Sequence, residues 1–364
     1  MLRDPGNGAR STADRSTTAF RRRGIRGLAA AATAAALLSA TLAGCVSSGG
    51  GSTTNADGTT TVTIGVGGNI FDVPVNLANS AGYFAKEGVK VKFVTLTSAT
   101  GIAALQSGSV QFLTASPLDM ASAVSKQLPV EAVSAIGSGN PLGLVVSKKF
   151  ATAHGLTSGS SPSQVAIALA GSTAGYSSSN TKAEAGIYLK AYDIDPGKVN
   201  WVELPSPAAD KTALTTNQID WFVTSEPTPL ELQNTGDGVV VADPLTVPQW
   251  SAAEAGYGLF TVVKKSYASS NAAAVQKVVA AIQDATAYMN AHPGDATVLK
   301  AAATTLPGVP NTVLSGSLQQ VVWPTDARMT QADWTKTVAF LNSLGTISGG
   351  ANVTSDSWTN QYLS

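Results

Sequence analysis

The chain has 364 residues, with 23 basic and 23 acidic side chains and a single cysteine, Cys45. Seven of the basic and two of the acidic side chains lie within residues 1–27, so residues 45–364 carry 16 basic and 21 acidic groups, a net charge of −5. This balance argues against a nucleic-acid-binding protein, which needs a basic face to neutralise phosphates, and one cysteine excludes a disulfide within the chain.

The N-terminal residues have the layout of a secretion signal. Residues 1–27 are rich in arginine, and residues 28–43 are 16 uncharged residues, fewer than the roughly 20 that a membrane-spanning helix needs. The residues Leu-Ala-Gly then precede Cys45, in a sequence that resembles the lipobox of bacterial lipoproteins. The resemblance implies that residues 1–44 are a lipoprotein signal peptide and that Cys45 carries the lipid.

The export route has two interpretations. Arg22 and Arg23 resemble a twin-arginine signal, but the arginine-rich start also suits the Sec route. Lipidation would anchor the exported protein to the outer face of the cytoplasmic membrane, and residues 45–61, rich in Ser, Gly and Thr, would form a flexible tether of roughly 20 Å. An uncleaved anchor helix with an incidental cysteine is the alternative.

From residue 62 onward, strand and helix patterns alternate in two sets. The first set has predicted strands at 61–68, 89–96, 110–115 and 129–136, and predicted helices at 74–88, 98–108 and 116–126. The second set has predicted strands at 172–178, 199–204, 219–225 and 238–244, and predicted helices at 180–195, 207–217 and 226–234. A strand at 257–267 and amphipathic helices at 271–290 and 329–345 complete the chain, and their apolar stripes are expected to be core. The alternation predicts parallel sheets covered by helices on both faces.

Two stretches share one layout, which indicates two similar lobes. Residues 104–117 and 213–227 each run from a helix end, through Gly108 or Asn217, into a strand that ends in Ser, Thr and Pro. Gly and Asn both tolerate the left-handed backbone that such a reversal needs. The expected division is residues 62–143 for the first part of lobe 1, 144–256 for lobe 2, and 257–364 for the return to lobe 1 with the C-terminal helices. Two strands would cross between the lobes as a hinge, near residues 137–140 and 256–258.

Candidate ligand-binding residues lie at the carboxyl ends of the predicted strands, where open parallel sheets bind their ligands. These segments are rich in hydroxyls and small side chains and contain no Lys or Arg, so helix-start amides and hydroxyls would hold an anion. The candidates are Asn69, Phe71, Ser98, Thr100, Gly101, Thr114, Ser116, Asn140, Ser177, Ser179, Asn180, Thr181, Ser206, Ser225 and Glu226. The alternative is that the Ser and Thr residues only cap helices and fill loops.

Four charged side chains near the predicted cleft have two interpretations. Asp72, Asp119 and Glu226 either stabilise helix starts or face the cleft, where a carboxylate would pair with an amino or amidine group of the ligand. Arg328 either forms a surface ion pair with Asp326 or faces the cleft. The sequence leaves both interpretations open for each of the four.

The sequence offers little for catalysis. His154 in a predicted loop and His292 at a helix end lack any partner motif, and no His, Cys or Asp cluster has metal-ligand spacing. The glycines of residues 65–68 lack the third glycine of a dinucleotide-binding loop. We therefore expect a binding protein without cofactor or metal, and not an enzyme.

Several segments resemble the substrate-binding lipoproteins of nitrate-, sulfonate- and taurine-type ABC importers, a family whose relatives bind pyrimidine precursors of thiamine. Residues 77–93 resemble the opening helix and second strand of the family, residues 213–227 resemble its second-lobe counterpart, and residues 340–363 resemble its tail. Residues 104–112 also match, although Gln111 stands where an aspartate is usual.

The resemblance implies an α/β, two-lobed periplasmic-binding-protein fold of type II, in which each lobe is a parallel-rich sheet flanked by helices. It implies that a monomer captures a small organic anion, such as an alkanesulfonate, taurine or nitrate, by hinge closure and delivers it to ABC permease and ATPase subunits. A thiamine-precursor pyrimidine is the alternative ligand, favoured if Glu226 and an aromatic residue such as Phe71 or Tyr176 face the cleft. Two further functions on the same fold are a carbon–sulfur-cleaving enzyme, which would need a cysteine nucleophile, and a sensor without transport.

Overall fold

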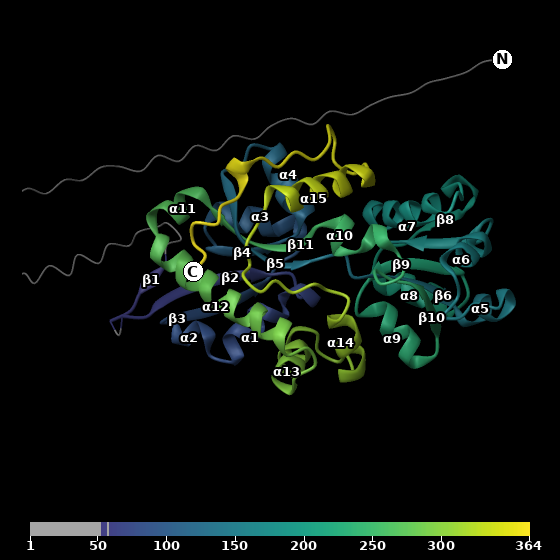
Figure 1. Ribbon diagram of the computed structural model, residues 1–364, viewed down its shortest axis with the longest axis horizontal. Coiled ribbons are helices and arrows are strands. Elements are labelled where there is room, and N and C mark those ends of the chain that lie inside the picture. The colour runs from purple at the N-terminus through teal and green to yellow at the C-terminus, as the bar shows by residue number, and fades with distance from the viewer. Residues whose placement is uncertain (1–51, 57) are drawn as a thin grey trace, which may run out of the picture. The chain divides into compact units, whose positions relative to one another are not determined.

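The chain forms two mixed β-sheets with helices on both faces (Figure 1). The computed structural model describes residues 52–56 and 58–364, so the predicted signal peptide and Cys45 lie outside the described residues. Within the described part, no helix combines the length and the apolar composition that crossing a membrane requires.

Six strands form the first sheet. They are β1 (Thr53–Thr54), β2 (Thr60–Val66), β3 (Val89–Thr95), β4 (Phe112–Ala115), β5 (Val130–Ser138) and β11 (Tyr257–Lys264). β2 pairs in parallel with β3 and β4, whereas β11 lies antiparallel between β4 and β5. The sheet is therefore mixed and not parallel-rich as expected, because β11 belongs to the segment that returns from the second sheet and enters between β4 and β5 in the opposite direction.

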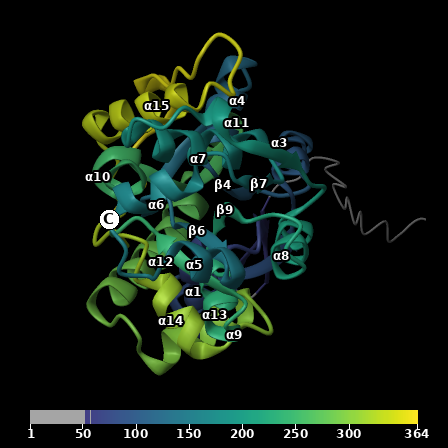
Figure 2. The same cartoon turned by 90° about the vertical axis from the view of Figure 1, so that its right-hand side faces the viewer.

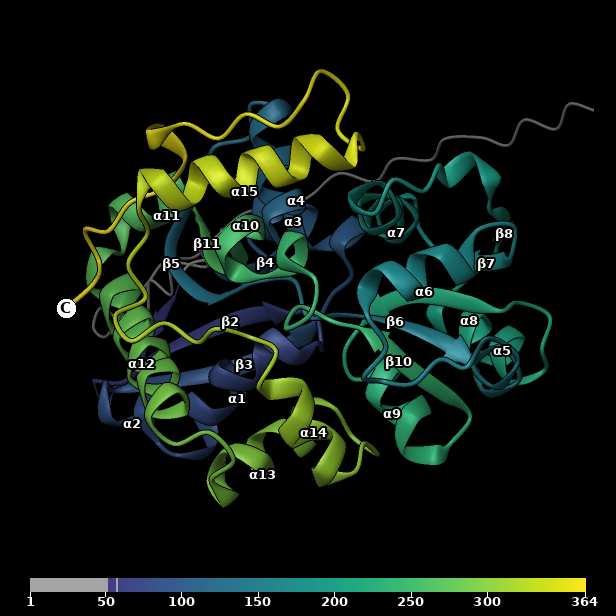
Figure 3. The same cartoon turned by 45° about the vertical axis from the view of Figure 1, so that its right-hand side comes forward.

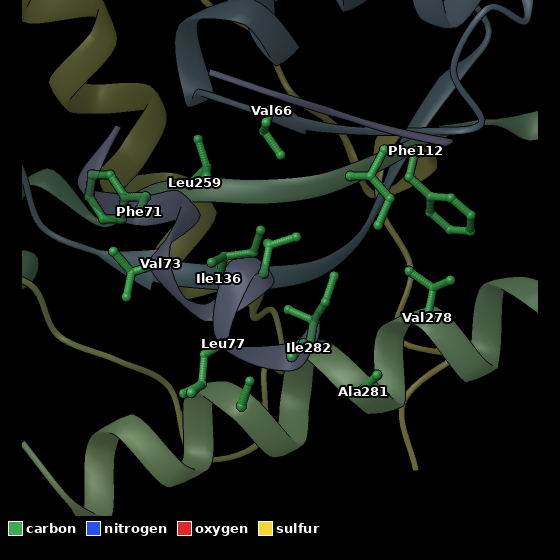
Figure 4. Packing of buried hydrophobic residues seen from close by; sticks show 14 of the residues in the cluster. Val66, Phe71, Val73, Leu77, Phe112, Ile136, Leu259, Val278, Ala281 and Ile282 are labelled. Atoms are coloured by element: carbon green, nitrogen blue, oxygen red, sulfur yellow. The ribbon is translucent and has the colours of Figure 1, made fainter. Parts of the chain in front are cut away.

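Helices cover both faces of the first sheet and enclose two hydrophobic cores. One face carries α1 (Val73–Ser80), α2 (Tyr83–Lys86), α12 (Ala272–Ala291) and α13 (Ala296–Thr305), and the other carries α3 (Ser98–Ser107), α4 (Pro117–Ser125) and α15 (Gln331–Leu344). Figure 4 shows Val278 and Ile282 of α12 pointing toward Ile136 and Phe112 of the sheet. The predicted core stripe of α12 is thus confirmed, and Trp334 of α15 is buried as expected.

Five strands form the second sheet, in the order β10 (Gly238–Ala242), β6 (Leu142–Ser147), β9 (Trp221–Ser225), β7 (Thr173–Tyr176) and β8 (Asn200–Glu203). β7 pairs in parallel with β8 and β9, and β6 is antiparallel to β9 and β10. The flanking helices are α5 (Lys148–His154), α6 (Pro162–Leu169), α7 (Ser179–Ala191), α8 (Pro207–Thr215) and α9 (Thr228–Thr235). Trp221 is fully buried between them, as its place inside a strand predicts.

The remaining elements are short. They are the helices α10 (Ala252–Ala255), α11 (Lys265–Ser270) and α14 (Asn311–Leu318) and the 3₁₀ turns η1 (Ile70–Asp72), η2 (Pro196–Lys198), η3 (Pro248–Trp250) and η4 (Ser355–Ser357). Figures 2 and 3 show α14 beside α9, so a helix near the C-terminus contacts the second sheet's helices.

The structure corrects three local expectations. The single helix predicted at 74–88 is two helices, because Gly82 takes a left-handed conformation with φ 83° and ends the first. His154 is the last residue of α5 and does not lie in a loop. β6, α5, α6, α13 and α14 were not predicted. The expected left-handed residues between helix and strand are confirmed, with φ 80° at Gly108 and φ 57° at Asn217.

The chain crosses between the sheets twice, and the crossings are hydrogen-bonded to each other. The first crossing leads from β5 to β6, and the second leads from η3 through α10 into β11. The amide of Gly139 donates to the carbonyl of Gly256 at 2.8 Å, and the amide of Asn140 donates to the carbonyl of Trp250 at 3.0 Å. Gly256, with φ 71°, has no room for a Cβ against the side chain of Thr337.

Candidate functional site

A cavity of about 310 Å³, here called the interlobe pocket, lies between the two sheets. The first sheet and its helices supply Asn69, Ile70, Phe71, Ser98, Ser116, Pro117, Leu118, Tyr257, Gly258, Leu259, Thr337, Phe340, Leu341 and Leu344. The second sheet and the crossings supply Gly139, Asn140, Pro141, Asn180, Glu184, Ser225, Glu226 and Ala255. Several of these residues follow the carboxyl ends of strands or begin helices, which is where ligands bind in such sheets.

Eight of the fifteen candidate residues line the interlobe pocket. They are Asn69, Phe71, Ser98, Ser116, Asn140, Asn180, Ser225 and Glu226. The hydroxyl-rich tips predicted from both halves of the chain therefore do meet in one hollow.

The other candidates lie elsewhere. Gly101 and Thr114 line a smaller adjoining cavity of about 70 Å³. The remaining positions outside the interlobe pocket are Thr100, Ser177, Ser179, Thr181 and Ser206. The Thr100 hydroxyl bonds with Thr97 at the start of α3, and Ser206 caps α8 by accepting from the amide of Ala209 at 3.2 Å.

Asp72 and Asp119 stabilise loop and helix starts of the first lobe. The Asp72 carboxylate is fully buried and accepts from the amide of Gly68 at 2.7 Å and from the Thr114 hydroxyl at 2.7 Å. Burial raises the pKa of Asp72, and these hydrogen bonds partly offset the rise. Asp119 accepts from the amide and the hydroxyl of Ser116 at the start of α4, so it occupies donors that an anion would otherwise use.

Arg328 does not line the interlobe pocket. Its Nε lies 3.9 Å from Oδ2 of Asp326, and both side chains are exposed. Of the two interpretations that the sequence left open for Arg328, the surface ion pair is the one that the structure shows. The described residues that line the pocket therefore include no Lys or Arg.

Two carboxyl groups do face the pocket, both from the second lobe. Glu226 follows β9 and is 4% exposed, and Glu184 lies in the second turn of α7 and is 8% exposed. Burial raises the pKa of each carboxyl group to about 7. Sequence reasoning missed Glu184, although its spacing of four residues from Asn180 puts both on one face of a helix.

Aromatic side chains divide between the pocket and the surface. Phe71 lines the pocket and packs edge-on to Trp323, with ring centroids 6.2 Å apart. Tyr176 does not line the pocket, because its hydroxyl donates to Glu203 and Lys182 lies over its ring, 4.6 Å from the centroid.

Within the described part of the chain, no group of three or more His, Cys, Asp or Glu residues could hold a metal ion. The two histidines pack against neighbouring rings. His154 lies 4.2 Å from Phe150 and His292 lies 4.5 Å from Tyr288, measured between ring centroids. The interlobe pocket is thus a hollow of amides, hydroxyls, two carboxyl groups and apolar walls.

Comparison with known proteins assigns the chain to a family. A family model described as "NMT1/THI5 like" matches residues 72–296. A search among curated proteins finds no match to the chain.

Solved structures share the fold. The ligand-binding component of an ABC-type import system from Staphylococcus aureus, with zinc bound, has a TM-score of 0.65 at 14% identity and covers 83% of this chain and 97% of its own. A putative periplasmic sulfonate-binding protein from Methylobacillus flagellatus has a TM-score of 0.61 at 16% identity, covering 84% and 92%. A mutant of DSZB in complex with biphenyl-2-sulfinic acid has a TM-score of 0.57 at 15% identity, covering 79% and 92%. At these identities the likeness shows the fold, and the expected type II periplasmic-binding-protein fold is confirmed.

Proposed function

Since the chain belongs to the NMT1/THI5-like family, we propose that it is the solute-binding component of an ABC importer. The observation that carries the proposal is the interlobe pocket, whose walls come from both sheets and from the two crossings. Proteins named as import-system binding components share the fold, which supports the same role here.

Capture would proceed by hinge closure. The two crossings are joined by backbone hydrogen bonds, so they suit a hinge between the first sheet and the second. The boundary expected between residues 143 and 144 falls inside β6 (Leu142–Ser147), so we place this end of the hinge before Leu142. A solute that contacts both lobes stabilises the closed arrangement by its differential affinity for that state. The permease and the ATPase would then recognise the closed, loaded form.

We propose a small organic solute of the sulfonate type, with taurine as the first candidate. Sulfonate oxygens accept hydrogen bonds, and the pocket offers hydroxyl and amide donors in Ser225, Asn69 and Asn180. The Ser98 hydroxyl would have to leave Asp119, to which it donates at 3.4 Å. Nitrate and simple alkanesulfonates would use the same donors. Taurine adds an amino group, for which a pocket carboxyl group provides an acceptor.

A thiamine-precursor pyrimidine is the second candidate. Glu226 and Phe71 both line the interlobe pocket. A carboxyl group and an aromatic ring at the cleft are the features that we expected to favour this ligand. An aromatic face and a carboxyl group together can hold a ring that carries an amino group.

Binding without catalysis is the proposed activity. Among the described residues that line the pocket there is no Cys or His to act as a nucleophile or base, which disfavours a carbon–sulfur-cleaving enzyme. A sensor would use the same pocket, so the importer role needs its own test. Stimulation of the cognate permease–ATPase complex by the loaded protein would support import.

We also propose export and lipid anchoring at Cys45, with the residues between Cys45 and β1 (Thr53–Thr54) as the tether. The tether expected over residues 45–61 is too long, because β1 pairs with the start of β2 at Thr60 and Thr61. Fractionation of cells that express the wild type and Cys45→Ser tests this directly. The wild type is expected in the membrane fraction and Cys45→Ser outside it, whereas equal membrane association of both proteins would contradict a lipid anchor.

The ligand is tested by a thermal-shift screen with taurine, alkanesulfonates, nitrate and aminopyrimidines. A ligand that binds only the native state raises the melting temperature, by mass action. At least one compound is expected to raise it in the wild type, and Asn180→Ala is expected to reduce that shift. No shift with any compound, even at millimolar concentration, would contradict the proposed solute classes.

A further inference from the structure

Glu184 is a buried carboxylate with one oxygen unused. Its Oε1 accepts from Nδ2 of Asn140 at 2.9 Å, while Oε2 has no hydrogen-bond partner within the described part of the chain. Oε2 is not one of the fully buried side-chain atoms that lack a partner among the described residues, so it is accessible from the pocket although the side chain as a whole is 8% exposed. Since Glu184 lines the interlobe pocket, its free oxygen is available to a bound solute.

The position of the Glu184 carboxylate is fixed by the hinge. Asn140 lies on the first crossing, and its backbone amide donates to the carbonyl of Trp250 on the second lobe's return segment at 3.0 Å. The same asparagine therefore links the crossing backbone and the carboxylate through separate groups. An acceptor held this way loses little freedom when a solute binds, which favours affinity.

Glu226, the other carboxyl group of the pocket, is already satisfied. It accepts from the hydroxyl of Ser317 at 2.9 Å, from Nε2 of Gln320 at 3.3 Å and from the amide of Leu230 at 3.4 Å. Ser317 belongs to α14, so this carboxyl group joins the second lobe to a helix that packs on the first. Glu226 therefore acts between the lobes, and Glu184 remains the carboxyl group that is open to a ligand.

The surroundings of Glu184 favour a positive charge. No Lys or Arg is among the described residues of the pocket, and Lys182 of the same helix lies over the Tyr176 ring outside it. Phe71 and Phe340 also line the pocket and give it aromatic walls. A cation gains from a carboxylate in low dielectric and from nearby aromatic faces, whereas a plain anion gains from neither.

We infer that the solute carries a cationic nitrogen, an ammonium or amidinium group, that donates to Oε2 of Glu184. Glu184 thereby selects such solutes over analogues that lack the charged nitrogen. The inference rests on the proposed function, because it assigns one contact inside the proposed ligand pocket. Among the solutes named above, taurine has this nitrogen and nitrate and simple alkanesulfonates do not.

The test uses two matched pairs of compounds. Taurine and isethionate share an ethanesulfonate body and differ in an ammonium against a hydroxyl group, and benzamidine and benzamide differ in an amidinium against a neutral amide. Binding of each to the wild type, Glu184→Gln and Glu184→Asp is measured by calorimetry and by thermal shift. Glu203→Gln, a change at an exposed glutamate outside the pocket, is the matched control.

The wild type and Glu203→Gln are expected to bind the cation of at least one pair about tenfold or more tightly than its analogue, because charge-assisted hydrogen bonds are the strong ones. Glu184→Gln keeps the acceptor for Asn140 but removes the charge, so the preference is expected to fall to about twofold or less. Glu184→Asp keeps the charge and is expected to retain a preference of the same sign.

Two results would overturn the inference. One is that neither cation binds the wild type, and the other is that a preferred cation binds Glu184→Gln equally well. Neither result alone refutes the solute-binding role: if isethionate or nitrate binds the wild type, the proposed function stands while the assignment of Glu184 fails. If all compounds fail, including nitrate and the aminopyrimidines, both proposals fail together.

Discussion

Replacing Glu184 by glutamine measures the cost of burying this carboxyl group. Burial raises the pKa of Glu184 from its ordinary 4.5 to about 7, and the hydrogen bond from Asn140 offsets only part of the rise. Between these pH values the native state keeps a proton that the unfolded chain has released. The free energy of unfolding therefore falls as the pH rises through this window, and the stability present below pH 4.5 is lost by the time the pH passes about 7.

The size of the effect follows from the shift. When the native state binds one proton more than the unfolded chain, the free energy of unfolding falls by about 1.4 kcal/mol per pH unit. The rise in the pKa of Glu184 therefore lowers the free energy of unfolding by about 3 kcal/mol across the window. Glu184→Gln has no such loss at this position. Its free energy of unfolding is expected to match the wild type near pH 4.5 and to exceed it by up to about 3 kcal/mol at pH 8. The pKa of Glu226 is also raised to about 7, so the free energy of unfolding of both the wild type and Glu184→Gln falls further over the same pH range.

Urea unfolding followed by tryptophan fluorescence, at intervals from pH 4.5 to 8, gives the required free energies. Glu203→Gln serves as the control and is expected to follow the wild-type curve. A difference between Glu184→Gln and the wild type that stays constant with pH, or a variant that is less stable at pH 8, would refute the reasoning.

Three further changes have defined outcomes in urea unfolding. Gly256→Ala introduces a Cβ where φ is 71° and no space exists, so its free energy of unfolding should fall by about 2 kcal/mol or more. Gly155→Ala is the control, with φ 62° and open space, and its free energy of unfolding should fall by about 1 kcal/mol. Equal losses in the two variants would contradict the crossing geometry. Ser317→Ala removes a donor to buried Glu226 and should cost about 1–3 kcal/mol, and no change would show that this contact is absent. Trp334→Ala empties a fully buried site and should cost about 3–5 kcal/mol, and a loss below 1 kcal/mol would contradict its place in the core.

The fold was predictable where local pattern decides the element. Left-handed Gly108 and Asn217, each between a helix and a strand, follow from residue type and position, and the apolar stripe of α12 follows from helical spacing. The antiparallel placement of β11 was not predictable, because it depends on how the returning chain pairs with distant strands. β6 has no helical or alternating period, since it is buried on both faces.

The candidate site shows the same division. Strand-tip reasoning places Asn69, Ser116, Asn180 and Ser225 in one pocket, because the topology of the sheets brings strand ends together. It does not separate a pocket hydroxyl from one that only caps a helix, as at Thr100. Glu184 was missed because it lies within a helix, away from any strand end, and only the packing of α7 beside the hinge turns it toward the pocket.

A crystal structure of the protein grown with the compound that gives the largest thermal shift would decide where the solute binds. The expected result is density for the compound between the first-lobe residues Asn69 and Phe71 and the second-lobe residues Asn180 and Glu184, with a nitrogen within hydrogen-bond distance of Glu184. Density on an outer surface, or in a hollow that only one lobe supplies, would contradict capture between the lobes.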